Sequence, residues 1–154
     1  MWEEVVEAAA AHDLGVMPYY EYAGSTGPQG LALQSKNKKL IKPLTRDDTY
    51  THVTWVEKKQ VDLTDPATWE DFKHVLDLTV MELKDKANFV GIWMRPRHAQ
   101  MPMSFSPTTL ARFAEQTDRD KVTRKELSED EFLLQSYYDW WVGKRKEFLT
   151  RISD

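Results

Sequence analysis

The chain has 154 residues, of which 41% are apolar, and this length and composition predict a single globular domain with a substantial hydrophobic core. Its formal net charge is −4, and its lysines and arginines are scattered instead of forming the basic stripe of a nucleic-acid-binding protein. The lack of cysteine excludes disulfide bonds, thiolate zinc sites and thiol nucleophiles, which fits a reducing compartment without establishing one.

The N-terminal part predicts a helix followed by a buried strand. Trp2, Val5 and Val6 share a helical face in "MWEEVVEAAAAHD", which is acidic and lacks the basic start and apolar core of a signal peptide. "LGVMPYYEY", residues 14–22, predicts a strand whose nearly continuous apolar start favours burial on both faces. Residues 24–48 are rich in Gly, Ser, Lys, Asn and Asp and predict a long loop, a kind of segment that is usually functional or mobile.

The middle of the chain predicts further strands around a helix. "YTHVTWVEKKQVDLTDP", residues 50–66, predicts one or two short strands. Its last two residues, Asp65 and Pro66, predict a helix start, because Asp caps a helix and Pro fits the first turn. The spacing of apolar residues then extends this helix to about Lys84. "NFVGIWMRP", residues 88–96, predicts another buried strand that its proline ends.

The C-terminal part predicts two helices. Ser106 followed by Pro107 is a helix start of the same kind, and the helix is expected to end near Glu115. Ser128 and Glu131 stand at capping-box spacing and predict the start of a final helix that runs to about residue 152. No stretch approaches the about 18 consecutive apolar residues of a membrane span, so we expect no membrane partner and, in the absence of an export signal, the cytoplasm by default.

The order of these elements predicts an α/β fold built from parallel βαβ units. A closed (β/α)8 barrel takes about 200 residues or more. Residues 1–154 are therefore expected to form one α/β domain that is a partial, TIM-barrel-like segment of a larger barrel, with a small open sheet covered by helices as the alternative. An incomplete barrel would expose sheet edges and favour self-association or pairing with the missing remainder.

Polar side chains at the predicted strand ends indicate a site. Side chains alternate along a strand, so Glu21 shares a face with Tyr19, while Arg95 shares a face with Trp93 and is expected to point inward. Asp62 is the corresponding acid of the strand between them. Ligands of parallel α/β sheets bind at the carboxyl ends of the strands, although any strand also becomes polar where it leaves the core.

Aromatic residues near these ends favour a carbohydrate ligand. A sugar ring offers an apolar face to an aromatic ring and a rim of hydroxyl groups to polar neighbours. The predicted substrate-binding residues are Tyr19, Tyr22, Trp55, Trp93, Arg95, Arg97 and His98. Aromatic residues on the amphipathic helices are expected to fill the core instead.

The chain also resembles a known group of proteins. The runs "PYYEYAGS", "YTHVTWVEKKQVDLTDPATWEDF", "GIWMRPRHAQMPMSFSPTTLARFA" and "YYDWWVGKRKEFL" are similar to uncharacterised glycoside-hydrolase-like (β/α)8-barrel proteins of environmental bacteria. The resemblance covers most of the chain but only part of such a barrel. It implies a hydrolase-type barrel that acts on a polysaccharide or glycoconjugate, and it assigns no catalytic residue. The sequence also lacks the Asn-Glu pair that ends a strand in the large retaining-glycosidase clan.

Two functional hypotheses follow. In the first, the chain is a glycosidase, with Glu21 as the acid and Asp62 or Glu57 as the second carboxyl group that glycosidic cleavage needs. In the second, it is a non-catalytic carbohydrate-binding or structural segment, which an ion pair between Glu21 and Arg95 would favour. Arg95 with Arg97 and His98 would favour an acidic sugar.

Other chemistries have little support in the sequence. "AGSTGPQG" matches neither a phosphate-binding loop nor a dinucleotide fingerprint, and no GxSxG nucleophile motif is present. The four histidines are far apart and form no pair with the spacing of metal ligands. We therefore expect no cofactor, no metal site and no nucleic-acid partner.

Overall fold

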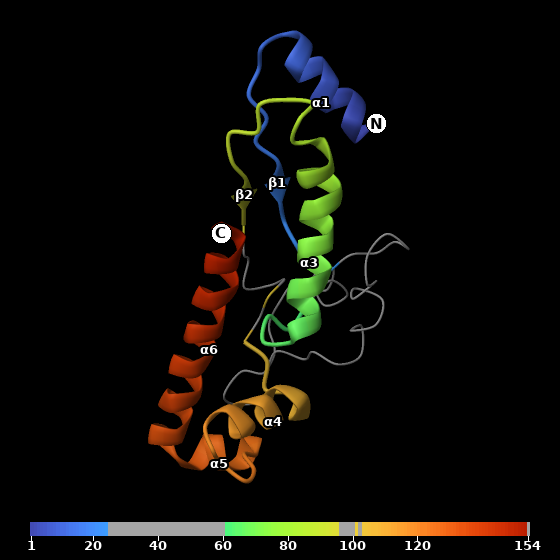
Figure 1. Ribbon diagram of the computed structural model, residues 1–154. Coiled ribbons are helices and arrows are strands. Elements are labelled where there is room, and N and C mark those ends of the chain that lie inside the picture. The colour runs from blue at the N-terminus through green and yellow to red at the C-terminus, as the bar shows by residue number, and fades with distance from the viewer. Residues whose placement is uncertain (25–60, 96–100, 102, 154) are drawn as a thin grey trace, which may run out of the picture.

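The computed structural model describes residues 1–24, 61–95, 101 and 103–153 (Figure 1). Of these residues, 59% are helical and 6% are in strands or bridges. The elements in chain order are α1 (Trp2–Ala11), β1 (Tyr19–Tyr20), α3 (Pro66–Thr79), the short 3₁₀ helix η2 (Met81–Leu83), β2 (Trp93–Met94), α4 (Pro107–Gln116), α5 (Arg124–Glu129) and α6 (Glu131–Ser153). The protein is thus mainly helical over its described part.

The predicted α/β fold, a partial (β/α)8 barrel of parallel βαβ units, is wrong. The described residues contain a single two-stranded parallel sheet of β1 and β2, in which Tyr19 pairs with Trp93, and show no repeated βαβ units. Residues 61–65 form a turn and not the end of a strand, because the Asp62 carboxylate accepts a hydrogen bond from the Thr64 backbone N–H at 2.9 Å. Residues 25–60, which include most of the predicted loop 24–48 and the strands expected before residue 61, lie outside the described residues.

The helix starts predicted from a cap followed by proline are confirmed. The Asp65 carboxylate accepts from the Ala67 backbone N–H at 3.0 Å, and Pro66 opens α3. Ser106 caps α4 in the same way, by accepting from the Thr109 backbone N–H. The α-helix α3 ends at Thr79, and η2 follows it, so the expected continuous helix to Lys84 is not formed.

The predicted start of the last helix is wrong. The capping box belongs to Thr123 and Glu126, which open the short helix α5. Ser128 lies inside α5, where its hydroxyl donates to the Lys125 carbonyl. The long helix α6 follows directly, and the Asp130 carboxylate accepts from the Leu133 backbone N–H at 3.0 Å. Helices α5 and α6 therefore each begin at a capping residue of their own, Thr123 and Asp130, and neither residue was predicted as a helix cap.

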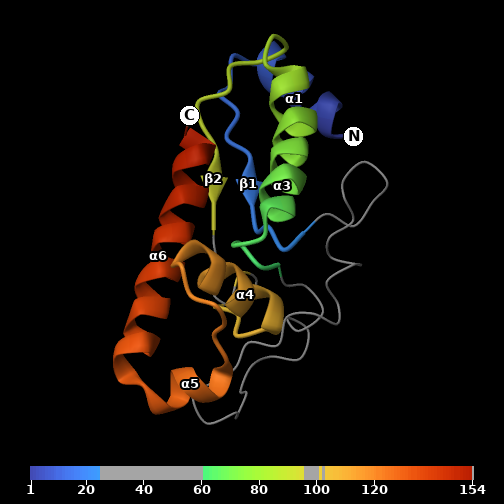
Figure 2. The ribbon, with the colours of Figure 1, turned by 60° about the horizontal axis from the view of Figure 1, so that its bottom comes forward.

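Helices α3 and α6 flank the paired strands, while α4 and α5 lie together at one end of the molecule (Figures 1 and 2). The cores under these elements form two clusters. The first joins α3, α6 and the strand region and contains Tyr22, Val61, Leu63, Phe72, Met101, Trp141 and Phe148. The second joins α4, α5 and the first half of α6 and contains Leu110, Phe113, Ala114, Val122, Leu127, Leu134 and Tyr137. Helix α6 contributes to both clusters and connects them.

The small sheet has one buried and one exposed face, so the expectation of burial on both faces is wrong. Tyr20 and Met94 point to the first core cluster and are half-buried. Met17, Tyr19 and Trp93 lie on the other face with 54%, 46% and 61% of their surface exposed. Parallel sheets are usually covered on both faces. The exposed face is therefore unusual and presents large apolar side chains to solvent.

At alkaline pH, Tyr22 and Tyr137 are expected to ionise only when the protein unfolds. Burial raises the pKa of both hydroxyls, assisted by the hydrogen bond to Asp71 at Tyr22 and by the charge of Asp62 at Tyr137. Their folded pKa values exceed the unfolded value of about 10. Their contribution to stability is therefore complete below about pH 10 and declines as the pH rises further.

Ultraviolet titration of tyrosinate, with unfolding followed by circular dichroism, tests this. Tyr137→Phe and Tyr22→Phe should each remove one ionisation that coincides with unfolding. Ionisation of all six tyrosines before unfolding would contradict the assignment.

Candidate functional site

The pairing of β1 with β2 places two aromatic rings side by side on the exposed sheet face. Tyr19 is the register partner of Trp93, and their ring centroids lie 5.1 Å apart in an edge-to-face arrangement. The strands are held by backbone hydrogen bonds, including Trp93 N–H to the Pro18 carbonyl at 2.8 Å and Arg95 N–H to the Tyr20 carbonyl at 2.9 Å. Regular backbone pairing therefore fixes the separation of the two rings.

An acid and a base stand beside these rings. Glu21 and Arg95 each follow an aromatic residue by two positions, so alternation places them on the same face. Arg95 Nη1 lies 3.4 Å from Glu21 Oε1, and the Tyr19 hydroxyl donates to the same carboxylate. The hydrogen bond with Tyr19 and the charge of Glu21 raise the pKa of Arg95. We call Tyr19, Glu21, Trp93 and Arg95 the sheet platform.

A second polar cluster surrounds Asp62, which is 4% exposed. Its Oδ1 accepts from the Thr64 hydroxyl at 2.7 Å in addition to the Thr64 N–H, and its Oδ2 accepts from Arg112 at 3.1 Å and from the Thr109 hydroxyl. Arg112 also forms a 2.7 Å salt bridge with Asp65. Arg112 on α4 thus joins the capping residue of α3 to the buried turn before it.

The donors around Asp62 stabilise its buried charge. A buried carboxylate is costly unless hydrogen bonds and a counter-charge compensate it, and four donor groups do so here. Asp62 was predicted as a catalytic partner of Glu21, and the structure instead places it in contact with protein groups that fix the relative positions of α3 and α4. The geometry thus gives Asp62 an evident structural role.

Tyr22, a predicted substrate-binding residue, lies in the core. It is 6% exposed, and its hydroxyl donates to Asp71 Oδ2 at 2.5 Å and to the Thr68 carbonyl at 3.2 Å. Its ring packs against Phe72 with the centroids 4.7 Å apart. The sequence analysis did not identify Asp71 as its partner, although Thr68, Asp71 and Phe72 share the three-and-four spacing that marks the buried side of α3.

The structure therefore brings together four of the predicted site residues, namely those of the sheet platform, and places Asp62 and Tyr22 in buried contacts. Glu57, Trp55, Arg97 and His98 lie outside the described residues. Within the described ranges, no group of three or more His, Asp or Glu side chains could hold a metal ion. No helix in the same ranges is both long and apolar enough to cross a membrane.

Comparison with protein-family models, with curated proteins and with solved structures finds no match to this chain. The resemblance to glycoside-hydrolase-like proteins thus stays a prediction. The case for a function must come from the geometry of the sheet platform.

Replacement of Arg112 by Met is expected to lower the free energy of unfolding by roughly 3 kcal/mol, because it leaves the buried Asp62 carboxylate without its counter-charge. Urea unfolding followed by circular dichroism measures the change. The matched control is Lys125→Met, which removes an exposed salt bridge to Glu129 and should change stability little. A loss for Arg112→Met no larger than that of the control would show that the Asp62 cluster does not stabilise the fold.

Proposed function

We propose that the protein binds a carbohydrate on the sheet platform. The observation that carries this proposal is the pair of exposed, adjacent rings of Tyr19 and Trp93 beside the Glu21–Arg95 ion pair. Aromatic faces stack against the apolar C–H face of a sugar. A carboxylate accepts hydrogen bonds from sugar hydroxyls and a guanidinium donates to them, so the two groups together match both hydrogen-bonding roles of a hydroxyl.

Binding is favoured over hydrolysis by the surroundings of the carboxylates. Glycosidic cleavage uses two carboxyl groups, about 5 to 5.5 Å apart in retaining enzymes and about 6.5 to 9.5 Å apart in inverting ones, and one of them must be protonated. The Arg95 guanidinium beside Glu21 favours the ionised carboxylate and so opposes a role as general acid. The Asp62 carboxylate already accepts hydrogen bonds from Thr64, Thr109 and Arg112. The proposal is therefore confined to carbohydrate binding.

The charges of the sheet platform favour a neutral sugar. Glu21 and Arg95 cancel within one ion pair, so the sheet platform carries no net charge from these two groups. A uronic acid would place its carboxylate near Glu21 as well as near Arg95, and the like charges would repel. The earlier expectation of an acidic sugar depended partly on Arg97 and His98, which lie outside the described residues.

Isothermal titration with soluble neutral oligosaccharides, such as cellodextrins, xylo-oligosaccharides and manno-oligosaccharides, tests the proposal. Trp93→Ala is expected to weaken binding by about tenfold, because loss of a stacked ring removes roughly 1.4 kcal/mol. Tyr19→Ala should weaken binding as well, since it removes the second ring and a hydrogen bond to Glu21.

The matched control is Phe132→Ala, which removes an aromatic side chain that is 90% exposed at the start of α6 and belongs to no part of the sheet platform. This variant should bind like the unaltered protein. Equal weakening by Phe132→Ala and Trp93→Ala would show non-specific adsorption on exposed aromatic surface. The absence of binding to any of these neutral oligosaccharides would reject the proposed function.

A further inference from the structure

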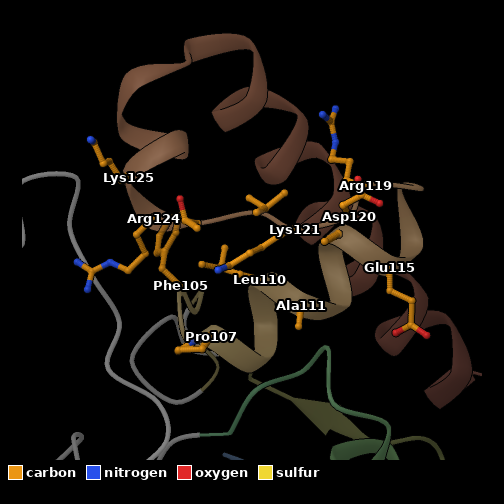
Figure 3. Close-up of a pocket in the computed structure, with 13 residues that line it drawn as sticks. Phe105, Pro107, Leu110, Ala111, Glu115, Arg119, Asp120, Lys121, Arg124 and Lys125 are labelled. Atoms are coloured by element: carbon orange, nitrogen blue, oxygen red, sulfur yellow. The ribbon is translucent and has the colours of Figure 1, made fainter.

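A groove between α4 and α5 forms a second surface that contains no residue of the sheet platform (Figure 3). Its volume is about 580 Å³, which is within the range of small-molecule sites. Phe105, Leu110, Ala114 and Val122 give it an apolar floor. We call this surface the α4–α5 groove, and its lining favours a ligand that differs in chemistry from a sugar.

Local interactions hold the walls of the groove in place. Helix α4 ends at Gln116, and Asp118 adopts a left-handed conformation with φ 54°, which lets the Arg119 N–H donate to the Ala114 carbonyl at 2.9 Å. On the opposite wall, the reciprocal capping box of Thr123 and Glu126 fixes the start of α5. The groove is thus formed by ordered backbone, and a ligand would enter a largely preformed site.

The rim of the groove is basic in a protein whose net charge is −4. Four basic side chains line it against two acidic ones, and Arg119, Arg124 and Lys125 among the bases already have interaction partners. Arg119 lies over the Phe113 ring at 5.9 Å, and Lys125 lies 3.7 Å from Glu129.

Lys121 is the cation best placed for a ligand. It forms no salt bridge with any described residue, and the Glu126 carboxylate, whose pKa the hydrogen bonds from Thr123 and the charge of Lys121 lower, accepts its hydrogen bonds from Thr123. In Figure 3 its side chain extends toward Phe105 and Leu110 over the floor, whereas Lys125 points away from the groove.

We propose that the α4–α5 groove binds a small organic anion with an apolar body, whose acidic group pairs with Lys121. The apolar floor would cover the body of such a ligand, and Lys121 Nζ would donate a charge-assisted hydrogen bond to its acidic group at the edge of the floor. The competing explanation is that the Lys121 stem only covers apolar surface, as long basic side chains commonly do. The two explanations differ in whether the charge of Lys121 matters.

The test uses 1-naphthoate as an anionic probe and 1-naphthalenemethanol as its neutral counterpart, with binding followed by the amide signals of the full chain in two-dimensional NMR. We expect 1-naphthoate to shift the signals of Ala111, Ala114 and Val122 and to bind about tenfold more tightly than the alcohol. Lys121→Met keeps the apolar stem and removes the charge, so it should remove this preference for the anion. Lys125→Met, on the same rim, is the matched control and should keep it.

A second variant tests the location of the site. Ala111 is exposed at the groove, and Ala111→Trp should fill the groove and abolish binding of both probes while the signals of the strands stay unchanged. Equal affinity for the two probes, or an anion preference that survives Lys121→Met, would overturn the proposal and leave Lys121 as a cover for apolar surface. Failure of 1-naphthoate to shift the groove signals would overturn it as well. None of these outcomes bears on carbohydrate binding at the sheet platform.

Discussion

The alternation of side chains along two paired strands is the constraint on which the rest of the arrangement depends. Because Tyr19 pairs with Trp93 and Tyr20 with Met94, one set of side chains packs into the core under α3 and α6 while the other set faces solvent. Tyr22 belongs to the first set and Glu21 to the second. A shift of the register by one residue would place Glu21 in the core and expose Tyr20 and Tyr22, so the core and the sheet platform are specified by the same pairing.

The surroundings of three carboxylates, those of Asp71, Asp62 and Glu21, determine whether each has a structural role or is accessible to a ligand. Asp71 accepts a hydrogen bond from Tyr22 inside the first core cluster, and Asp62 is neutralised by Arg112 between α3 and α4. Both are buried, and both hold elements together. Glu21 differs because its partners, Arg95 and the Tyr19 hydroxyl, are themselves partly exposed, so the same hydrogen-bonding groups can reach a ligand. Exposure of the partners, more than the identity of the acid, is the reason to place the ligand at the sheet platform.

Sequence reasoning succeeded where the determining interaction is local. Asp65 with Pro66 and Ser106 with Pro107 predicted the starts of α3 and α4, because a cap involves residues only two or three positions apart. It failed for the fold class, because alternation along residues 14–22 and 88–96 shows an extended chain but does not show how many strands pair or whether a helix covers each face. The four residues of the sheet platform were predicted as site residues because they lie at or near the ends of predicted strands. The burial of Tyr22 and Asp62 was missed, because it depends on contacts with α3 and α4 that lie 40 or more positions away in the sequence.

The two proposed surfaces differ in whether their charged side chains are paired with an opposite charge. At the sheet platform an acid and a base neutralise each other beside exposed rings, which suits a ligand that is polar but uncharged. At the α4–α5 groove Arg119 lies over a ring and Lys125 pairs with an acid, whereas Lys121 extends over an apolar floor without a salt bridge to a described residue, which suits an anion. The two surfaces are built on different core clusters, the first under the strands and α3, the second under α4 and α5. A ligand at one surface therefore need not displace a ligand at the other, and substitutions at the rim of one leave the packing beneath the other intact.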